Sequence, residues 1–163
     1  MNVKTLMTAV LGLGLIWATG CGKTDPTVPA KADEKKDTGG KGEQDDHGPG
    51  PHGGVVFDIG GGKWHGEFKP DHGKKSVTVW ILGADEKTAT PIKADKLRLV
   101  VSNTKPKIEI DLTPTDSENG TASTFTGKDN GFGVEMEYKG TVTFTVDGKQ
   151  YSGDFEEKPE PKK

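Results

Sequence analysis

The sequence predicts an all-β domain, specifically a single antiparallel β-sandwich behind a disordered tether. Residues 53–155 contain about nine short runs of alternating apolar and polar residues, which is the pattern of half-buried strands. Turn residues separate these runs, and no stretch of ten residues or more has apolar residues at helical spacing. Residues 22–50, in contrast, have almost no large apolar side chain, so they are expected to remain unfolded.

The chain begins with the pattern of a secretory signal peptide, which we place at residues 1–20. Lys4 precedes an apolar run from Leu6 to Ala18, and small residues lead to Cys21. This run of about 13 residues is shorter than the roughly 20 residues that a membrane-spanning helix needs. We therefore expect a cleaved signal rather than a permanent transmembrane helix.

The residues Ala18-Thr19-Gly20-Cys21 resemble the lipobox of bacterial lipoproteins, although Leu is usual where Ala18 stands. The resemblance implies that Cys21 is lipidated and begins the mature chain, with residues 21–50 as lipidated cysteine and tether. Each buried acyl methylene contributes about 0.8 kcal/mol, so several chains would give a stable membrane anchor. Gly22, in place of Asp, resembles members that are sorted to the outer membrane. The expected location is therefore the bacterial cell envelope, facing the periplasm.

The predicted strands follow one another at even spacing. The clearest is the run from Ser76 to Leu82, whose two faces both carry apolar side chains, so we expect it in the centre of the sheet. The other predicted strands are residues 55–59, 64–68, 97–102, 108–112, 123–126, 133–138, 141–146 and 150–155.

Turn signals connect several of these strands. Asp147-Gly148 is a two-residue signal for a type I′ hairpin, and Asn119-Gly120 and Gly60-Gly61-Gly62 indicate two further turns. Short strands at this spacing favour an immunoglobulin-like sandwich, with a small open barrel as the alternative. The domain is expected to span residues 51–157, followed by a frayed tail at residues 158–163.

Composition excludes several kinds of function. The net charge is -3 with both signs mixed along the chain, so we expect no nucleic-acid partner. Cys21 is the single cysteine, which excludes an internal disulfide and a second thiolate ligand for a metal. The Gly-x-Ser-x-Gly, phosphate-loop and His-Glu-x-x-His motifs are absent from the sequence, so we do not expect an enzyme.

All four histidines lie within 26 residues at the junction of tether and domain: His47, His52, His65 and His72. His65 and Glu67 are two apart in a predicted strand, so their side chains leave the same face. His52 precedes Gly53-Gly54, which can fold back and bring it within reach of that pair. His52, His65 and Glu67 are therefore predicted to bind a divalent transition metal, Zn(II) or Cu(II).

The remaining histidines and a simpler interpretation stay open. His72, beside Asp71, and His47, within the tether, are second-place candidates because the sequence fixes no geometry for them. A strand histidine beside a glutamate can also be a surface pair worth a few tenths of a kcal/mol. In that alternative the chain is a structural or adaptor lipoprotein, without enzymatic activity, whose histidines are incidental.

His52-Gly53-Gly54 followed by Trp64-His65-Gly66-Glu67 resembles a pattern of small exported bacterial proteins of the His-Gly-Gly, His-x-Glu type, some of which accompany heavy-metal efflux systems. The resemblance covers Pro51 to about Leu82, and Gly66 stands where a larger residue is common. It implies a metal buffer or carrier in the envelope, with an efflux component as a candidate protein partner. Because imidazoles bind metals in the neutral form, affinity should fall below roughly pH 6.5.

Overall fold

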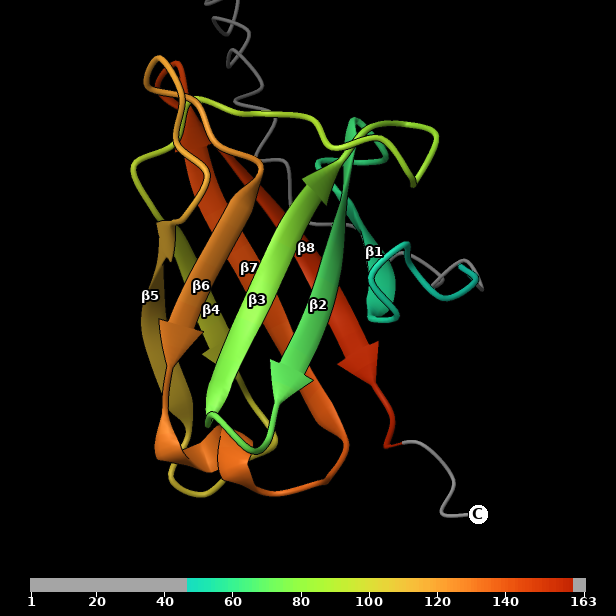
Figure 1. Cartoon of the computed structure of the whole chain (residues 1–163), viewed down its shortest axis with the longest axis vertical. Coiled ribbons are helices and arrows are strands. Elements are labelled where there is room, and N and C mark those ends of the chain that lie inside the picture. The colour runs from blue at the N-terminus through green and yellow to red at the C-terminus, as the bar shows by residue number, and fades with distance from the viewer. Residues whose placement is uncertain (1–46, 160–163) are drawn as a thin grey trace, which may run out of the picture. The chain divides into compact units, whose positions relative to one another are not determined.

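The computed structural model describes residues 47–159, which form eight strands and one short 3-10 helix (Figure 1). The strands are β1 (Val55–Ile59), β2 (Trp64–Asp71), β3 (Ser76–Leu82), β4 (Leu97–Val101), β5 (Ile108–Pro114), β6 (Thr124–Lys128), β7 (Tyr138–Val146) and β8 (Lys149–Glu157), and the 3-10 helix η1 is Asn130–Gly133. None of the described residues belongs to a helix long and apolar enough to cross a membrane. The predicted signal peptide, the lipobox with Cys21 and the tether up to residue 46 lie outside this range.

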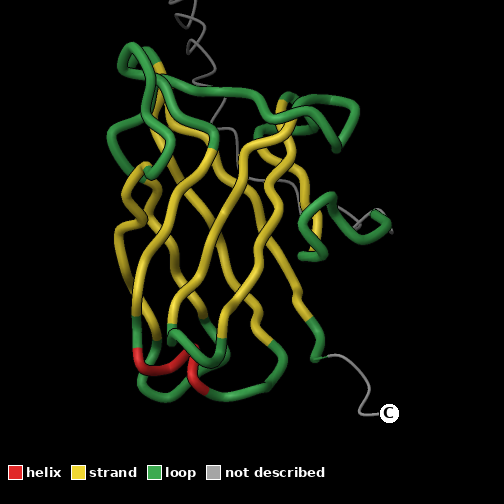
Figure 2. Tube along the Cα trace, in the orientation of Figure 1, coloured by secondary structure: helices red, strands yellow, loops and turns green. Residues whose placement is uncertain are grey.

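The strands form one nearly closed sheet in which every pair of neighbours is antiparallel, in the order β1-β2-β3-β6-β5-β4-β7-β8. Figure 1 shows β2, β3 and β6 in front of β4, β7 and β8, and the tube in Figure 2 shows the same two layers. The end strands approach each other, since the N–H of Gly60 donates to the carbonyl oxygen of Ser152 at 3.1 Å. A Cβ on Gly153 would lie only 2.2 Å from the carbonyl oxygen of Asp58, so glycine permits this close approach of β8 to β1.

The hydrophobic core fills the space between the two layers. Its largest fully buried side chains come from strands of both layers and from η1, and include Phe57, Phe68, Leu97, Leu99, Leu112, Phe125, Phe132 and Tyr138. The rings of Phe68 and Phe155 stack with their centroids 4.1 Å apart, which joins β2 to β8. This packing fixes β1 and β2, the two strands that carry the histidine cluster described below, against the rest of the domain.

Several sequence predictions are confirmed. The domain is all-β and antiparallel, and β3 has the predicted bounds and lies between β2 and β6. Asp147 and Gly148 join β7 to β8 with φ of 50° and 77°, as a type I′ turn requires. The three glycines from Gly60 to Gly62 join β1 to β2 with φ of 63°, 69° and 79°, and Asn119-Gly120 forms a turn closed by the bridge between residues 118 and 121.

The structure differs from the predicted strand 133–138, because residues 133–137 do not form a strand. The Tyr138 side chain is fully buried and its hydroxyl donates to the carbonyl oxygens of Gly131, at 3.0 Å, and Val134. The chain therefore turns around this ring as η1 and an irregular segment instead of extending. Since β7 begins at Tyr138 and includes the predicted strand 141–146, eight strands replace the expected nine.

Candidate metal centre

Alternation along β1 and β2 places two acids and a histidine on the outer face of the sheet. Asp58 pairs with His65, and Val56 pairs with Glu67, so these four residues share one face. Phe57 and Phe68 occupy the opposite, inner face and are buried in the core. The hydrophobic pattern of the hairpin therefore determines that His65 and Asp58 stand side by side on adjacent strands.

Residues 47–54, which we call the covering segment, fold back over this outer face. Pro49 forms a bridge with Val55, and the N–H of Gly50 donates to the carbonyl oxygen of Gly54 at 3.0 Å. Glu67 and His65 beneath the segment are only 0% and 6% exposed. The expected boundary between tether and domain, at residue 50, thus falls inside a segment that packs on the sheet.

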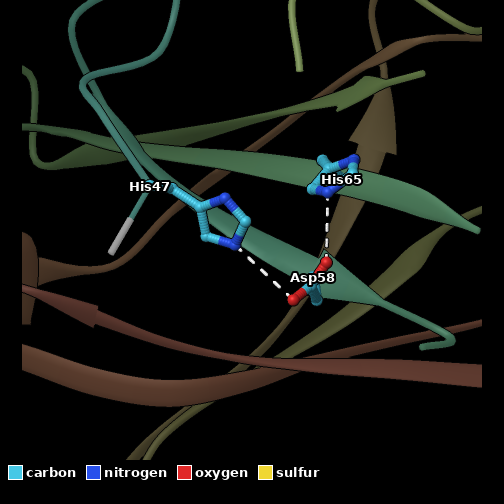
Figure 3. Close-up of side chains that lie close together, drawn as sticks. All are labelled: His47, Asp58 and His65. Atoms are coloured by element: carbon cyan, nitrogen blue, oxygen red, sulfur yellow. Dashed lines mark ion pairs between the residues drawn. The ribbon is translucent and has the colours of Figure 1, made fainter. Parts of the chain in front are cut away.

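His47, at the start of the covering segment, meets Asp58 and His65 (Figure 3). Nε2 of His47 lies 3.5 Å from Oδ2 of Asp58, and Nε2 of His65 lies 3.1 Å from Oδ1 of the same carboxylate. The ligand atoms of the three residues lie within 4.8 Å of one another. Two ligands of a tetrahedral ion at about 2.1 Å lie roughly 3.4 Å apart, so the two nitrogen–oxygen distances suit such a site. We call these three residues the His–Asp–His centre.

Burial in the His–Asp–His centre differs between the rings and the acids. The His47 and His65 side chains are 9% and 8% exposed, whereas those of Asp58 and the neighbouring Glu86 are 41% and 37% exposed. The imidazoles are therefore held by packing, while the carboxylates open a path from solvent for an ion.

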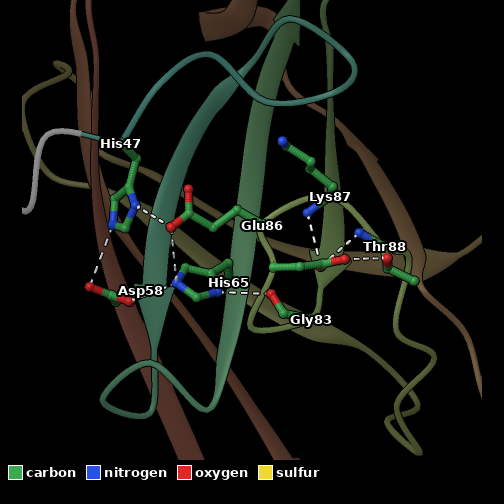
Figure 4. Close-up of polar contacts among 8 residues, drawn as sticks. His47, Asp58, His65, Gly83, Glu86, Lys87 and Thr88 are labelled. Atoms are coloured by element: carbon green, nitrogen blue, oxygen red, sulfur yellow. Dashed lines mark hydrogen bonds and ion pairs between the residues drawn. The ribbon is translucent and has the colours of Figure 1, made fainter.

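Every ring nitrogen of the two histidines faces an oxygen (Figure 4). Nδ1 of His65 lies 2.9 Å from the carbonyl oxygen of Gly83, and Nδ1 of His47 lies 3.1 Å from Oε1 of Glu86. A neutral imidazole has one N–H, so it can donate to only one of its two oxygen neighbours. In a neutral ring the other nitrogen therefore directs a lone pair toward its oxygen neighbour, and this is an arrangement in which a cation can bind between the two atoms.

The cationic side chains of lysine and arginine do not neutralise this cluster. Among residues 47–159, the ion pairs of Asp58 and Glu86 are all with His47 and His65. In contrast, the acids on the outer face of β4 and β5 are paired with lysine and arginine: Lys96 with Asp111, Arg98 with Glu109 and Asp111, and Lys107 with Glu109. Within the described part of the chain, two carboxylates thus share two imidazoles and no other counter-charge.

His52 and Glu67 form a second cluster on the same outer face. Oε1 of Glu67 accepts the backbone N–H groups of His52 and Gly54, each at 2.8 Å, and Oε2 lies 2.7 Å from Nδ1 of His52. The His52 ring stacks on Trp80 with centroids 4.1 Å apart and planes 5° apart. Both oxygens of this buried carboxylate are therefore occupied by groups of the covering segment.

The three ligands predicted from the sequence lie in two separate clusters of the structure. His65 belongs to the His–Asp–His centre, while His52 and Glu67 contact each other, because backbone N–H groups of the covering segment hold the Glu67 carboxylate. His47, a second-place candidate, takes the position expected of His52. Asp58 was missed, although alternation across the Gly60 to Gly62 turn could have placed it opposite His65. Glu86 has no such signal, since it lies in a loop after β3.

His72 lies away from both clusters. Its Nδ1 is 2.8 Å from the carbonyl oxygen of Phe132, and its ring stacks near Tyr138. The neighbouring Asp71 carboxylate is occupied by Lys74, whose side chain and backbone N–H hold its pKa below the usual range. In the described range the His–Asp–His centre is the one group of three or more such ligands within 4.8 Å.

Comparison with known proteins yields no relative. The chain matches no family model, no curated protein and no solved structure. The case for its function therefore rests on the residues and their geometry.

Proposed function

We propose that this chain is a lipid-anchored protein of the bacterial envelope that binds a divalent transition metal, Zn(II) or Cu(II), as a buffer or carrier. One observation carries the metal-binding part: two nearly buried imidazoles direct Nε2 at a single shared carboxylate, Asp58. Two imidazole nitrogens and a carboxylate oxygen suit ions of the zinc and copper class. Calcium and magnesium instead prefer sites built from oxygen alone.

Binding rather than catalysis fits this arrangement. A hydrolytic metal site needs a base beside the metal-bound water. Here the Asp58 carboxylate would be a ligand, and Glu86 is engaged by Nδ1 of His47. Neither acid is then free to take a proton from water, so we propose a role in holding and handing over the ion. A metal efflux component of the envelope is the proposed recipient.

The metal proposal is tested by calorimetric titration of Zn(II) and Cu(II) into the detergent-solubilised full chain. The decisive variant is H47Q/H65Q, and the matched control is H52Q/H72Q, which removes the same number of imidazoles outside the centre. We expect one-to-one binding of micromolar affinity or tighter that is lost in H47Q/H65Q and kept in the control. Loss in both variants would favour the set His52, His65 and Glu67, since each variant removes one of its histidines, and no binding by the unaltered chain would leave a structural or adaptor lipoprotein.

The pH dependence gives a second test of the same site. Because protons compete with the metal ion for the imidazole nitrogens, affinity should fall as the pH is lowered. An affinity that is unchanged down to pH 5 would argue against histidine ligands.

The proposed anchor rests on the lipobox-like residues that end at Cys21. We expect radiolabelled palmitate to be incorporated into the unaltered chain and not into the C21S variant. Equal labelling of both chains, or of neither, would contradict lipidation at this cysteine.

A further inference from the structure

The loop from Gly83 to Thr88, which follows β3, touches both histidines of the His–Asp–His centre (Figure 4). The carbonyl oxygen of Gly83 lies 2.9 Å from Nδ1 of His65, and Oε1 of Glu86 lies 3.1 Å from Nδ1 of His47. Both contacts are to Nδ1, while Nε2 of each ring faces Asp58. One short loop therefore meets the same ring position on two histidines that come from different parts of the fold.

The loop is held in shape by its own hydrogen bonds. The Asp85 carboxylate accepts the backbone N–H groups of Lys87, at 3.1 Å, and Thr88, at 2.9 Å, and also the Thr88 hydroxyl. The N–H of Gly83 donates to the carbonyl oxygen of Thr88 at 2.9 Å, which closes the loop at its base. Such an Asx turn fixes the backbone on either side of Glu86.

Glu86 itself adopts an unusual backbone conformation. Its φ is 59°, in the left-handed region that non-glycine residues seldom adopt, and its N–H donates to the carbonyl oxygen of Gly83 at 3.1 Å. Such conformations persist where the surrounding structure enforces them, and they concentrate at functional sites. Here the consequence of the conformation is that the Glu86 carboxylate reaches His47.

We propose that the 83–88 loop fixes the orientation of the two histidines of the metal centre from outside, and we call this loop the outer brace. This inference rests on the proposed function. The carbonyl oxygen of Gly83 accepts the Nδ1–H of His65, and the Glu86 carboxylate, paired with Nδ1 of His47 at 3.1 Å, keeps the N–H of that ring on Nδ1, which leaves the lone pair of each Nε2 for the ion. The metal is then held by three side chains, Nε2 of both histidines and Asp58, with further positions open to water or to a donor from a recipient protein. Glu86 is a positioning residue that acts through His47.

Two distances favour positioning over direct ligation by Glu86. Oε1 of Glu86 is 3.1 Å from Nδ1 of His47 but 3.8 Å from Nε2 of His65, the atom that would bind the ion. Carboxylates that lie beside the second nitrogen of a metal-binding histidine fix its tautomer and orientation. The arrangement also suits a carrier, since an ion with three protein ligands retains exchangeable positions.

The brace is tested with E86A and E86Q in the full chain, using E118A as the matched control at a turn outside the centre. Zinc affinity is measured by competition with a chromophoric chelator. We expect E86A to bind Zn(II) about 10- to 100-fold more weakly, and E86Q to stay close to the unaltered chain because its amide oxygen can accept the same N–H. Equal weakening in E86A and E86Q would identify Glu86 as a ligand and overturn the brace.

A spectroscopic measurement separates this inference from the proposed function. Long-range ¹H–¹⁵N NMR of the zinc-loaded chain should show Nδ1–H and metal-bound Nε2 for both His47 and His65, with His52 and His72 unchanged by zinc. Coordination of His47 through Nδ1, or full affinity in E86A, would overturn the brace while leaving metal binding intact. Failure of the unaltered chain to bind zinc would instead overturn the proposed function itself.

Discussion

Two histidine–carboxylate clusters share the outer face of β1 and β2, and they differ in what surrounds the carboxylate. Glu67 is fully buried and accepts two backbone N–H groups in addition to the His52 ring. Asp58 is partly exposed and faces two imidazole nitrogens. The first carboxylate holds a chain segment in place, whereas the second faces imidazole nitrogens, which can also bind a metal ion.

This difference shows that a histidine and a carboxylate can form either a structural contact or a candidate metal site. Backbone N–H groups are permanent donors, so a carboxylate that accepts them has a fixed structural role at every pH where it is ionised. An imidazole nitrogen is a donor or an acceptor depending on its protonation. The contacts of a carboxylate that faces only imidazoles therefore change with the state of those rings. Four experiments test this comparison, and they are given from the largest expected effect to the smallest.

The largest effect is expected from Glu67→Ala. Removing this carboxylate leaves the N–H groups of His52 and Gly54 without their acceptor beneath the covering segment. We expect a loss of about 3 kcal/mol in the free energy of unfolding, measured by urea denaturation without metal. Asp58→Ala should cost less than about 1 kcal/mol under the same conditions, because its carboxylate is partly exposed. Equal losses in the two variants would remove the distinction between the clusters.

Zinc should stabilise the unaltered chain and not the H47Q/H65Q variant. A ligand that binds only the folded state adds about 2.7 kcal/mol at a concentration 100-fold above its Kd. We expect the corresponding rise in Tm by calorimetry for the unaltered chain and for H52Q/H72Q. A similar rise in H47Q/H65Q would show that zinc binds elsewhere.

A smaller effect is expected when the turn that presents Glu86 is disturbed. The Thr88 hydroxyl, with the backbone N–H groups of Thr88 and Lys87, lowers the pKa of Asp85 to about 2. The turn is therefore supported above the ordinary pKa near 3.8 and loses that support as the pH falls toward 2. An NMR titration should show the Asp85 carboxyl carbon changing with a midpoint near 2, and D85A should weaken zinc binding less than E86A does. A midpoint near 4 would mean that these hydrogen bonds are absent in solution.

Glu157 is a carboxylate in a third kind of environment. Its substitution is expected to have the smallest effect. Its Oε2 is buried without a hydrogen-bond partner in the described residues, and this burial raises its pKa, while the nearby His72 acts in the opposite direction. An acid with a raised folded-state pKa stabilises the fold most below its unfolded pKa, and that contribution is lost as the pH rises through the folded value.

We therefore expect E157Q to raise Tm by roughly 2 °C at pH 7 and to leave it unchanged at pH 4. The measurement is differential scanning calorimetry at both pH values, with E118Q as the exposed control. A stabilisation of the same size at both pH values would mean that the charge of Glu157 is not its cause.

The fold could be predicted from local signals to a large extent. Alternation with a period of two gave the bounds of β3, and residues that tolerate positive φ marked the turns at Gly60 to Gly62 and Asp147-Gly148. The prediction was wrong at residues 133–137, where the buried Tyr138 ring and its hydrogen bonds turn the chain. Local pattern cannot show which side chain a loop will wrap around, since that depends on distant packing.

The candidate site could be predicted only in part. Alternation correctly places His65 and Glu67 on one face of β2, and clustering of the histidines directs attention to this region. Which histidine meets which carboxylate depends on the path of the covering segment. Its glycines allow several paths, so the sequence permits pairing of His52 with either His65 or Glu67.

By itself, the sequence determined the antiparallel strands, their principal turns and the outward face shared by His65 and Glu67, because periodicity and turn chemistry act between near neighbours. The tertiary structure alone decided that His47 joins Asp58 and His65, that Glu67 closes on His52, and that the 83–88 loop reaches both rings of the centre. These contacts join the covering segment, β1, β2 and a loop after β3. Their physical cause is the packing and hydrogen bonding that bring such segments together, which no local pattern records.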